Sequence, residues 1–288
     1  MGVLSSMFVI PNLLFFFFET TYGVDSISPS QSLTDGNTLV SKEGNFELGF
    51  FSPGSSKNHY LGIWYKNIPV KTVVWVANRD SPIDNSSGIL MINSTGSLVL
   101  LSQNKSVVWS TSSLKQAQTP LLQLLDTGNL VLVDEKNGNS EDYLWQSFDY
   151  PADTLLTGMK FGWDLKRGLN RRLIAWKNWD DPSSGDFILE MTLHNYPDVY
   201  LWQGSVKYFR AGPWNGIGFS GTPEVKNNVF NFTFVYNQDE VYFMYTLKDK
   251  SLISRAVPNQ TNSLIQIFTR EEIAQSWKLF FAQPGDPL

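Results

Sequence analysis

Few residues in this chain of 288 residues have the type and spacing that catalysis requires. There is no cysteine and only two histidines, His59 and His194, which excludes thiol nucleophiles, disulfides and zinc sites built from cysteine or several histidines. Both histidines are interpreted as turn or strand-end residues, and no serine stands in a recognisable nucleophile context. The adjacent carboxylates 180–181 and 271–272 cannot act across one substrate, because neighbours on a strand point to opposite faces. We therefore expect no catalytic residue, no metal site and no cofactor.

One stretch, residues 216–221 (GIGFSG), formally matches the glycine pattern of dinucleotide-binding loops. Such a loop works only between a strand and a helix, whose N-terminus binds the pyrophosphate. Pro213-Trp214 precede this stretch and Thr222-Pro223 follow it, which leaves no room for that helix. The sequence therefore predicts a turn.

The composition favours a folded β protein. Apolar residues make up 42% of the chain and charged residues 17%, which is unlike a disordered chain. The net charge of −5 argues against a nucleic-acid partner, because neutralising phosphates requires a basic surface. Aromatic residues at 14%, together with 21 Gly and 14 Pro, favour strands joined by tight turns. The length suggests two domains.

The N-terminus resembles a secretory signal. Residues 7–18 (MFVIPNLLFFFF) are too short to span a bilayer and contain a proline, although no Lys or Arg occurs before Lys42. A buried N-terminal strand or helix is the alternative to a signal peptide at 1–23. Five Asn-x-Ser/Thr sequons favour secretion and are candidate glycosylation sites: Asn85, Asn93, Asn104, Asn231 and Asn259.

Short β-rich runs separated by turn signals indicate a sandwich, barrel or prism. Residues 94–100 (STGSLVL) repeat as 126–132 (DTGNLVL), and each copy runs on to a tryptophan, Trp109 or Trp145. A weaker copy begins at Gly44 and reaches Trp64. Three such units predict three small sheets around a pseudo-threefold axis.

The second half continues the β-rich texture without a clear repeat. Residues 241–247 (VYFMYTL) are apolar on both faces and predict a strand covered on both sides. Residues 269–272 match a helix capping box before 273–280, which fits either a short helix or a strand.

Several motifs resemble one plant family. They are 46–51 (FELGFF), 60–65 (YLGIWY), 74–80 (VWVANRD), 125–132 (LDTGNLVL) and 144–156 (LWQSFDYPADTLL). They are similar to the bulb-type lectin domain of S-domain receptor-like kinases and S-locus glycoproteins, and 210–216 (RAGPWNG) resembles the family's S-locus glycoprotein segment.

The resemblance implies an all-β fold with a β-prism lectin domain at 24–150 and a second lectin-like β domain at 151–288. In relatives an EGF-like or PAN region, a membrane span and a cytoplasmic serine/threonine kinase follow. We therefore expect no enzyme activity in this chain and membrane attachment only through such a missing C-terminal span.

Mannose-binding relatives use the motif Q-x-D-x-N-x-V-x-Y, whose polar residues bind sugar hydroxyls. Alignment on Asn129 gives Leu125, Thr127, Asn129, Val131 and Val133; the second unit gives Asn93, Thr95, Ser97, Val99 and Leu101, and the first gives Ser41, Glu43, Asn45, Glu47 and Gly49. Most polar partners are missing, so we predict degenerate carbohydrate sites, represented by Thr127, Asn129 and Val131.

These observations predict a secreted or extracellular recognition module that binds a protein, peptide or glycoconjugate ligand. The resemblance implies a role in pollen recognition (self-incompatibility) or in defence signalling, with a homodimer or a receptor kinase as partner. The alternatives are a soluble mannose-binding defence lectin and, third, a cell-wall enzyme with a convergent carboxylate pair.

Overall fold

The computed structural model describes residues 24–112, 117–137, 143–193, 196–222, 228–259, 264–271 and 276–283. Within these ranges the regular elements are 24 strands and two short 3-10 turns, η1 (Glu135–Asn137) and η2 (Ser147–Asp149), so the predicted all-β class is confirmed. No helix in the described part of the chain could cross a bilayer. The predicted signal peptide at 1–23 and His194 lie outside the described residues.

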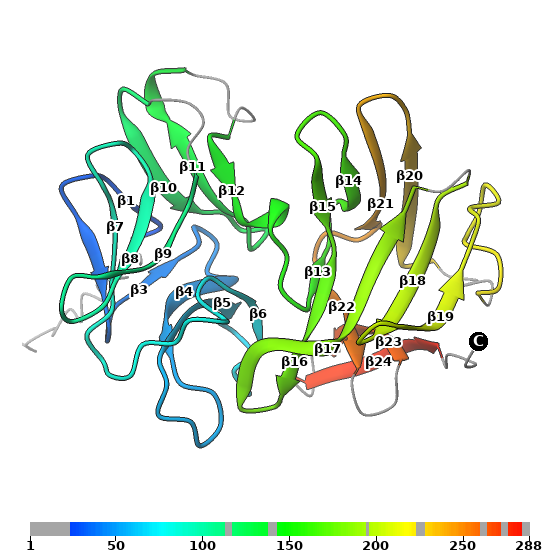
Figure 1. The fold of residues 1–288 in the computed structure, drawn as a ribbon, viewed down its shortest axis with the longest axis horizontal. Helices are drawn as coiled ribbons and strands as arrows, with labels where there is room; N and C mark the ends of the chain where they lie inside the picture. The colour runs from blue at the N-terminus through cyan, green and yellow to red at the C-terminus, as the bar shows by residue number, and fades with distance from the viewer. Residues whose placement is uncertain are drawn as a thin grey trace, which may run out of the picture.

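The first half forms three four-stranded antiparallel sheets (Figure 1). They consist of β3 (Thr38–Val40), β4 (Phe46–Phe51), β5 (Tyr60–Tyr65) and β6 (Val73–Val76); of β2 (Ser32–Thr34), β7 (Ile89–Ile92), β8 (Leu98–Leu101) and β9 (Val107–Ser110); and of β1 (Ser26–Ile27), β10 (Pro120–Leu124), β11 (Leu130–Asp134) and β12 (Trp145–Gln146). The N-terminal strands β1, β2 and β3 each supply the outer strand of a different sheet, which ties the three sheets together.

Strand register shows which residues are equivalent in the three sheets. Three cross-strand pairs occupy the same place: Ile63–Trp75, Leu100–Trp109 and Leu132–Trp145. The rings of Trp75, Trp109 and Trp145 meet edge to face, with centroids 5.8–6.0 Å apart, a favourable geometry for aromatic packing. The predicted pseudo-threefold arrangement is therefore confirmed, with these tryptophans around its axis.

The first repeat copy does not follow the sequence analysis. Its strand is β5 and its tryptophan is Trp75, so the copy predicted from Gly44 to Trp64 is wrong. Trp64 follows Ile63 on the strand and therefore points to the opposite face, where it packs against Phe51. The loop before β5, residues 52–59, is longer than the five-residue loops before β8 and β11 and lacks their Thr-Gly turn. The Gly96 and Gly128 turns have φ of +79° and +82°, which only glycine adopts readily.

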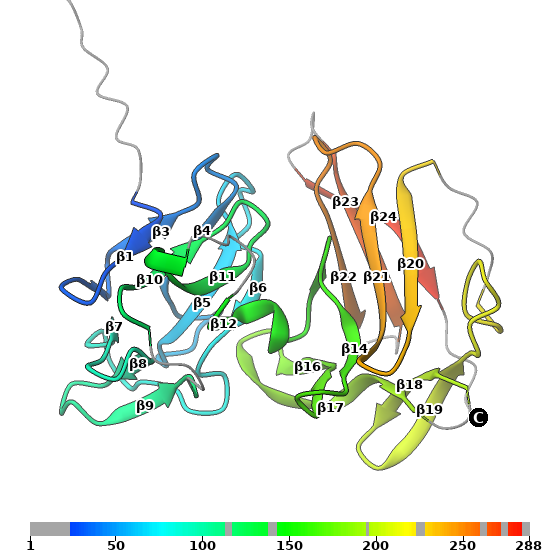
Figure 2. The same ribbon diagram turned by 90° about the horizontal axis from the view of Figure 1, so that it is seen from above.

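The second half contains three further four-stranded antiparallel sheets, seen beside the first half in Figure 2. They consist of β16 (Leu173–Asn178), β17 (Asp181–Thr192), β18 (Asp198–Gln203) and β19 (Val206–Ala211); of β15 (Leu169–Arg171), β14 (Phe161–Asp164), β21 (Glu240–Leu247) and β20 (Phe230–Tyr236); and of β13 (Leu155–Leu156), β22 (Ser254–Asn259), β23 (Leu264–Glu271) and β24 (Ser276–Gln283). This is the second lectin-like β fold that the sequence analysis expected.

Three local predictions are resolved here. Every residue of β21 is buried or half-buried, as its two apolar faces predicted. Residues 276–283 form a strand, which decides the alternative left open for this segment. Residues 216–221 form a turn, in which the N–H of Asn215 donates to the carbonyl oxygen of Gly218 at 2.9 Å.

A buried ion pair anchors the segment that joins the halves. Asp149, at the end of η2, accepts hydrogen bonds from Arg167 Nη1 at 2.6 Å and from Arg171 Nε at 2.7 Å. The side chains of Asp149 and Arg171 are both 4% exposed. Burial raises the pKa of Asp149, but Arg171 and Arg167 outweigh burial and hold that pKa below its usual value.

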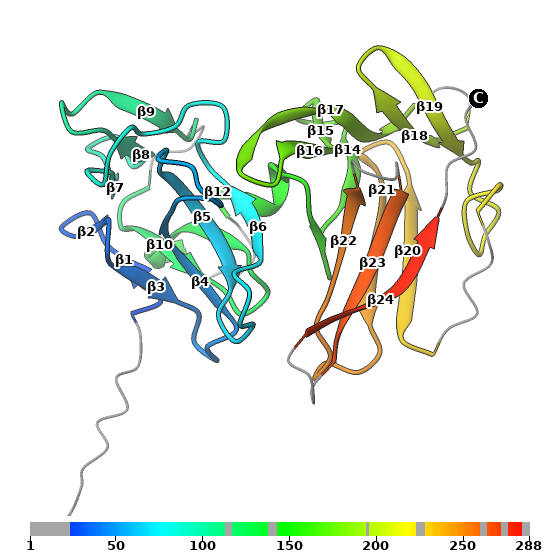
Figure 3. The same cartoon turned by 90° about the horizontal axis from the view of Figure 1, so that it is seen from below.

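Arg79 closes the junction from the other side. It follows β6, which lies against the β16–β17 hairpin in Figures 2 and 3. Its Nε donates to the carbonyl oxygen of Pro182 at 2.8 Å, and its Nη1 and Nη2 donate to those of Ile174 and Ala175, each at 3.0 Å. One guanidinium thus satisfies three main-chain acceptors of the second half.

Replacing Arg79 by lysine should destabilise the junction. A lysine ammonium lacks the planar fork of donors, so at least one buried carbonyl loses its partner, and we expect the free energy of unfolding to fall by about 2–4 kcal/mol. Urea denaturation followed by tryptophan fluorescence measures this. The matched control is Arg172→Lys, because Arg172 is 44% exposed and 3.6 Å from Glu190; its expected loss is below about 1 kcal/mol. Equal losses in the two variants would contradict the assignment.

Asp149→Asn should weaken the protein in a pH-dependent way. The pKa of Asp149 is lowered in the folded state, so its stabilising effect is complete above the unfolded pKa of about 3.9 and disappears as pH falls through the folded value. At pH 7 we expect a loss of about 3 kcal/mol, because buried Arg171 loses its closest ion pair and keeps only the longer contacts with Asp164 and Glu240, at 3.5 and 3.7 Å. The difference from the unmodified protein should narrow below about pH 4. Urea unfolding at pH 7, 4 and 3 tests this, with Asp84→Asn at an exposed carboxylate as control; a difference independent of pH would refute it.

Candidate functional site

Three hydrogen bonds define the register of the three repeat strands. A side-chain oxygen accepts one backbone N–H in each sheet: Asn78 from Leu61 at 2.8 Å, Thr111 from Leu98 at 3.0 Å and Ser147 from Leu130 at 2.9 Å. The residues preceding these leucines, Tyr60, Ser97 and Asn129, are therefore equivalent. The first-sheet counterpart of the sugar motif is thus residues 56, 58, 60, 62 and 64, not residues 41–49 as the sequence alignment placed it.

In the third sheet, the motif residues Asn129 and Val131 are buried, and Asn129 is hydrogen-bonded within the protein. Asn129 is 4% exposed. Its Nδ2 donates to Gln146 Oε1 at 2.9 Å, and its Oδ1 accepts from Ser147 Oγ at 3.1 Å and from the N–H of Phe148 at 3.2 Å. Val131 is buried, and Thr127 is exposed. Of the three residues, only Thr127 faces solvent.

The aligned residues of the other two sheets also make contacts within the protein. In the second sheet Asn93 Oδ1 accepts the N–H groups of Thr95 and Ser97 at 3.0 and 2.9 Å, which closes a turn. In the first sheet Tyr60 is buried, and Gly62 has no room for a side chain, since an added Cβ would lie 2.6 Å from Phe51 Cε1. In the first and third sheets the aligned positions are therefore buried, crowded or hydrogen-bonded within the protein.

The candidate glycosylation sites lie mainly at the surface. Asn85, Asn104 and Asn231 are exposed, Asn93 is half-buried, and Asn259 is the last residue of β22. Asn85 Nδ2 donates to Gln103 Oε1 at 2.9 Å, and Asn104 Oδ1 accepts from Ser102 Oγ at 2.7 Å. Asn85 and Asn104 line the same shallow polar depression.

The remaining candidates for chemistry are dispersed. His59 Nδ1 lies 3.0 Å from Asp35 Oδ2 in a loop, and Asp181 Oδ1 accepts the N–H of Ser183 at 3.0 Å within a hairpin. Among the described residues no group of three His, Asp or Glu side chains is placed to hold a metal ion.

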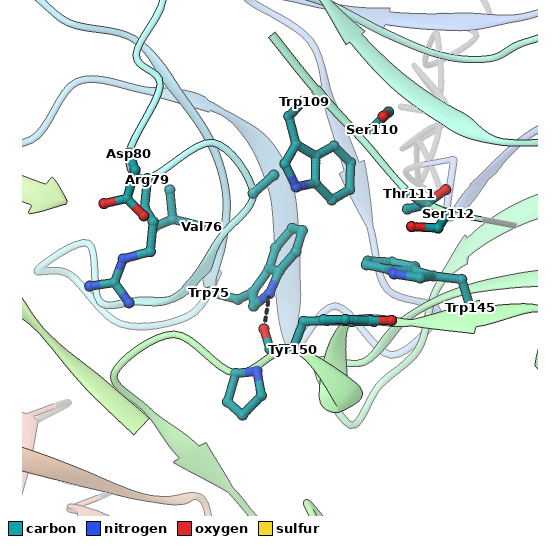
Figure 4. Close-up of a pocket in the computed structure, with 12 residues that line it drawn as sticks. Trp75, Val76, Arg79, Asp80, Trp109, Ser110, Thr111, Ser112, Trp145 and Tyr150 are labelled. Atoms are coloured by element: carbon teal, nitrogen blue, oxygen red, sulfur yellow. Dashed lines mark hydrogen bonds between the residues drawn. The ribbon is translucent and has the colours of Figure 1, made fainter. Parts of the chain in front are cut away.

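Sequence reasoning missed Trp75 and Tyr150, which line a pocket with the other two axial tryptophans (Figure 4). Only strand pairing reveals Trp75 as the third tryptophan of the pseudo-threefold axis.

Two family profiles match the chain. The profile of the D-mannose binding lectin family covers residues 72–177, and that of the S-locus glycoprotein domain covers residues 209–287. Over 98% of its length the chain is 45% identical to the receptor-like serine/threonine-protein kinase SD1-8 of Arabidopsis thaliana. Over 96% of its length it is 43% identical to the S-locus-specific glycoprotein S6 of Brassica oleracea. The chain belongs to the S-locus glycoprotein and S-domain receptor-like kinase family.

The match covers only part of these S-domain relatives. The chain spans 34% of the length of the kinase and 65% of that of the S-locus glycoprotein. Among solved structures, the fetuin-binding two-domain lectin of Scilla campanulata covers 91% of the chain at 11% identity, with 90% of the lectin covered and a TM-score of 0.30. The fold of this S-domain protein is established by its own six sheets.

Removing the amide of Asn129 tests its internal role. Asn129→Ala leaves the N–H of Phe148 and the side chains of Gln146 and Ser147 without their partner, so we expect a loss of about 2–4 kcal/mol in the free energy of unfolding. The neighbouring Thr127→Ala, at an exposed position, should change stability by less than about 0.5 kcal/mol. Denaturant unfolding of both variants measures this, and a neutral Asn129→Ala variant would disprove the structural role.

Proposed function

We propose that this chain is the extracellular recognition module of an S-domain receptor-like kinase, or a secreted S-locus glycoprotein-like protein. It binds a protein, peptide or glycoconjugate ligand, and it does so without mannose-type sites. The observation that carries this proposal is the hydrogen bonding and burial of the Asn129 side chain. Its amide nitrogen and oxygen are both engaged by the segment 146–148, and its exposed fraction is 4%.

Further parts of the proposal concern the mature protein. A signal peptide at 1–23 directs secretion, and the five sequons carry N-linked glycans. The bulb-type lectin domain spans 24–150 and the S-locus glycoprotein domain spans 151–288. The name of the Brassica relative, an S-locus-specific glycoprotein, supports recognition at the cell surface, in pollen recognition or in defence signalling. A second copy or a receptor kinase serves as partner.

The second candidate function is a soluble mannose-binding defence lectin. The match to the D-mannose binding lectin profile over residues 72–177 favours it. The motif sites of the first and third sheets oppose it, because Tyr60 and Asn129 are buried and Gly62 has no side chain to offer a sugar. A site that loses its hydrogen-bonding groups loses about 10⁴–10⁵ in discrimination for the ligand that needs them.

Secretion from plant cells followed by a sugar titration tests the proposal. When residues 1–288 are expressed, we expect a chain without residues 1–23 to appear in the medium, in a form whose mass falls on treatment with an N-glycosidase. In NMR titrations with methyl α-mannoside, we expect no saturable shift up to about 10 mM ligand, because the motif groups are replaced or already bonded.

Two results would contradict this proposal. Retention of an unglycosylated chain in the cytosol would refute the extracellular assignment. Saturable mannoside binding with a dissociation constant of about 1 mM or tighter, which corresponds to a binding free energy near −4 kcal/mol, would favour the mannose lectin.

A further inference from the structure

A pocket of about 270 Å³ opens at the axial tryptophans of the first half. Its lining comes from three separate segments: the end of β6 with the loop that follows it, the end of β9 with residues 111–112, and Trp145, Tyr150 and Pro151 of the joining segment. Figure 4 shows the rings of Trp75, Trp109, Trp145 and Tyr150 together, with Arg79 and Asp80 on one side and Ser110, Thr111 and Ser112 on the other. The pocket is separate from the three sugar-motif strands.

The three axial tryptophans differ in their hydrogen bonding. Trp75 Nε1 donates to the carbonyl oxygen of Tyr150 at 2.9 Å. In the described part of the chain, no partner is present for Nε1 of Trp109 or of Trp145. The reason is geometric, because the chain leaves the threefold unit at Tyr150 and can cover only one of three equivalent indoles. Among the described residues, neither Nε1 is a buried atom that lacks a partner, so both N–H groups are open to solvent. These two N–H groups are therefore free to donate to a ligand inside the pocket.

The aromatic rings that line the pocket can pack against C–H groups of a ligand. Tyr150 stacks on Trp145 with centroids 5.9 Å apart and an interplanar angle of 12°. It remains 41% exposed even though it is a large aromatic residue. Aromatic faces carry partial negative charge, so they attract methyl and ring C–H groups that bear partial positive charge.

The polar rim offers both hydroxyl groups and a fixed carboxylate. Ser110 and Ser112 are exposed. The carboxylate of Asp80 accepts the N–H of Ser184 at 2.8 Å and its hydroxyl at 3.2 Å, which holds it in place from the second half. Arg79 is committed to main-chain carbonyls of that half. The free polar groups are thus two indole donors, serine hydroxyls and the remaining acceptor capacity of Asp80.

We propose that this axial pocket binds an N-acetylhexosamine unit of a glycan. An acetamido group has the matching parts: its carbonyl oxygen accepts from an indole N–H, its methyl group packs on the rings, and its N–H donates to a serine hydroxyl or to Asp80. The volume of about 270 Å³ lies at the low end of small-molecule sites and has room for one sugar unit. This inference names a sugar class for the glycoconjugate ligand proposed above and in that respect rests on the proposed function.

Tryptophan-detected NMR of the full chain tests the proposal. With ¹⁵N-tryptophan labelling, N-acetylglucosamine should shift the indole signals of Trp109 and Trp145 saturably, while glucose, which lacks the acetamido group, should not. Trp109→Phe keeps an aromatic ring but removes the N–H, and it should weaken binding about tenfold, as expected for one lost hydrogen bond. Trp179→Phe is the matched control, because Trp179 is 72% exposed and outside the pocket.

Different results of these titrations would contradict the site, contradict its assignment to a sugar, or support the proposal. Equal shifts with glucose, unchanged affinity in Trp109→Phe, or absence of any shift at Trp109 and Trp145 would overturn the site. Equally tight binding of Nε-acetyllysine methylamide would overturn the assignment to a sugar, since the pocket would then recognise the acetamide alone. Loss of binding in Trp109→Phe with retention in Trp179→Phe supports the proposal, whatever the mannoside titration gives.

Discussion

The buried ion pair between Asp149 and Arg171 fixes the course of the segment that joins the two halves. Both side chains are 4% exposed, so the loss of one charge would remove the closest ion pair of a buried partner, which is strongly destabilising. The same segment contributes to three other structures. Trp145 completes the axial aromatic packing, Ser147 accepts the N–H of Leu130, and the carbonyl of Tyr150 accepts the indole N–H of Trp75. The threefold unit and its attachment to the second half therefore depend on one short stretch of chain.

The same segment also makes hydrogen bonds to Asn129, a residue of the sugar motif in the third sheet. Residues 146–148 satisfy both ends of the Asn129 amide, which in a mannose-type site would be free for sugar hydroxyls. The core of leucines and tryptophans forms the threefold unit, and the Asn129 amide adds hydrogen bonds between the end of the preceding turn and the segment 146–148. At the junction between the halves, Arg79 holds the β16–β17 hairpin in place through main-chain carbonyls.

Particular elements show how far the sequence could be interpreted. The Thr-Gly turns before β8 and β11 were visible because each is a five-residue loop with glycine at positive φ. The first copy was misplaced because its loop is longer and lacks that turn, so a neighbouring Gly-Asn-Phe stretch imitated it. The helix-or-strand alternative near the C-terminus could not be decided locally, since β24 exists through its pairing with β23.

Local patterns are enough to predict the β class, the two clear repeats and the sequons, because each pattern lies within a few positions of the chain. Residue types alone exclude thiol chemistry. Three features become visible only in the folded chain: the tryptophan that completes the axis, the internal hydrogen bonds of Asn129 and the pocket beside Tyr150. Those outcomes depend on partners far along the chain. The groups that bond Asn129 lie 17–19 residues away, and the carbonyls bound by Arg79 lie 95–103 residues away. No local pattern specifies such pairings, because they form only when the sheets pack.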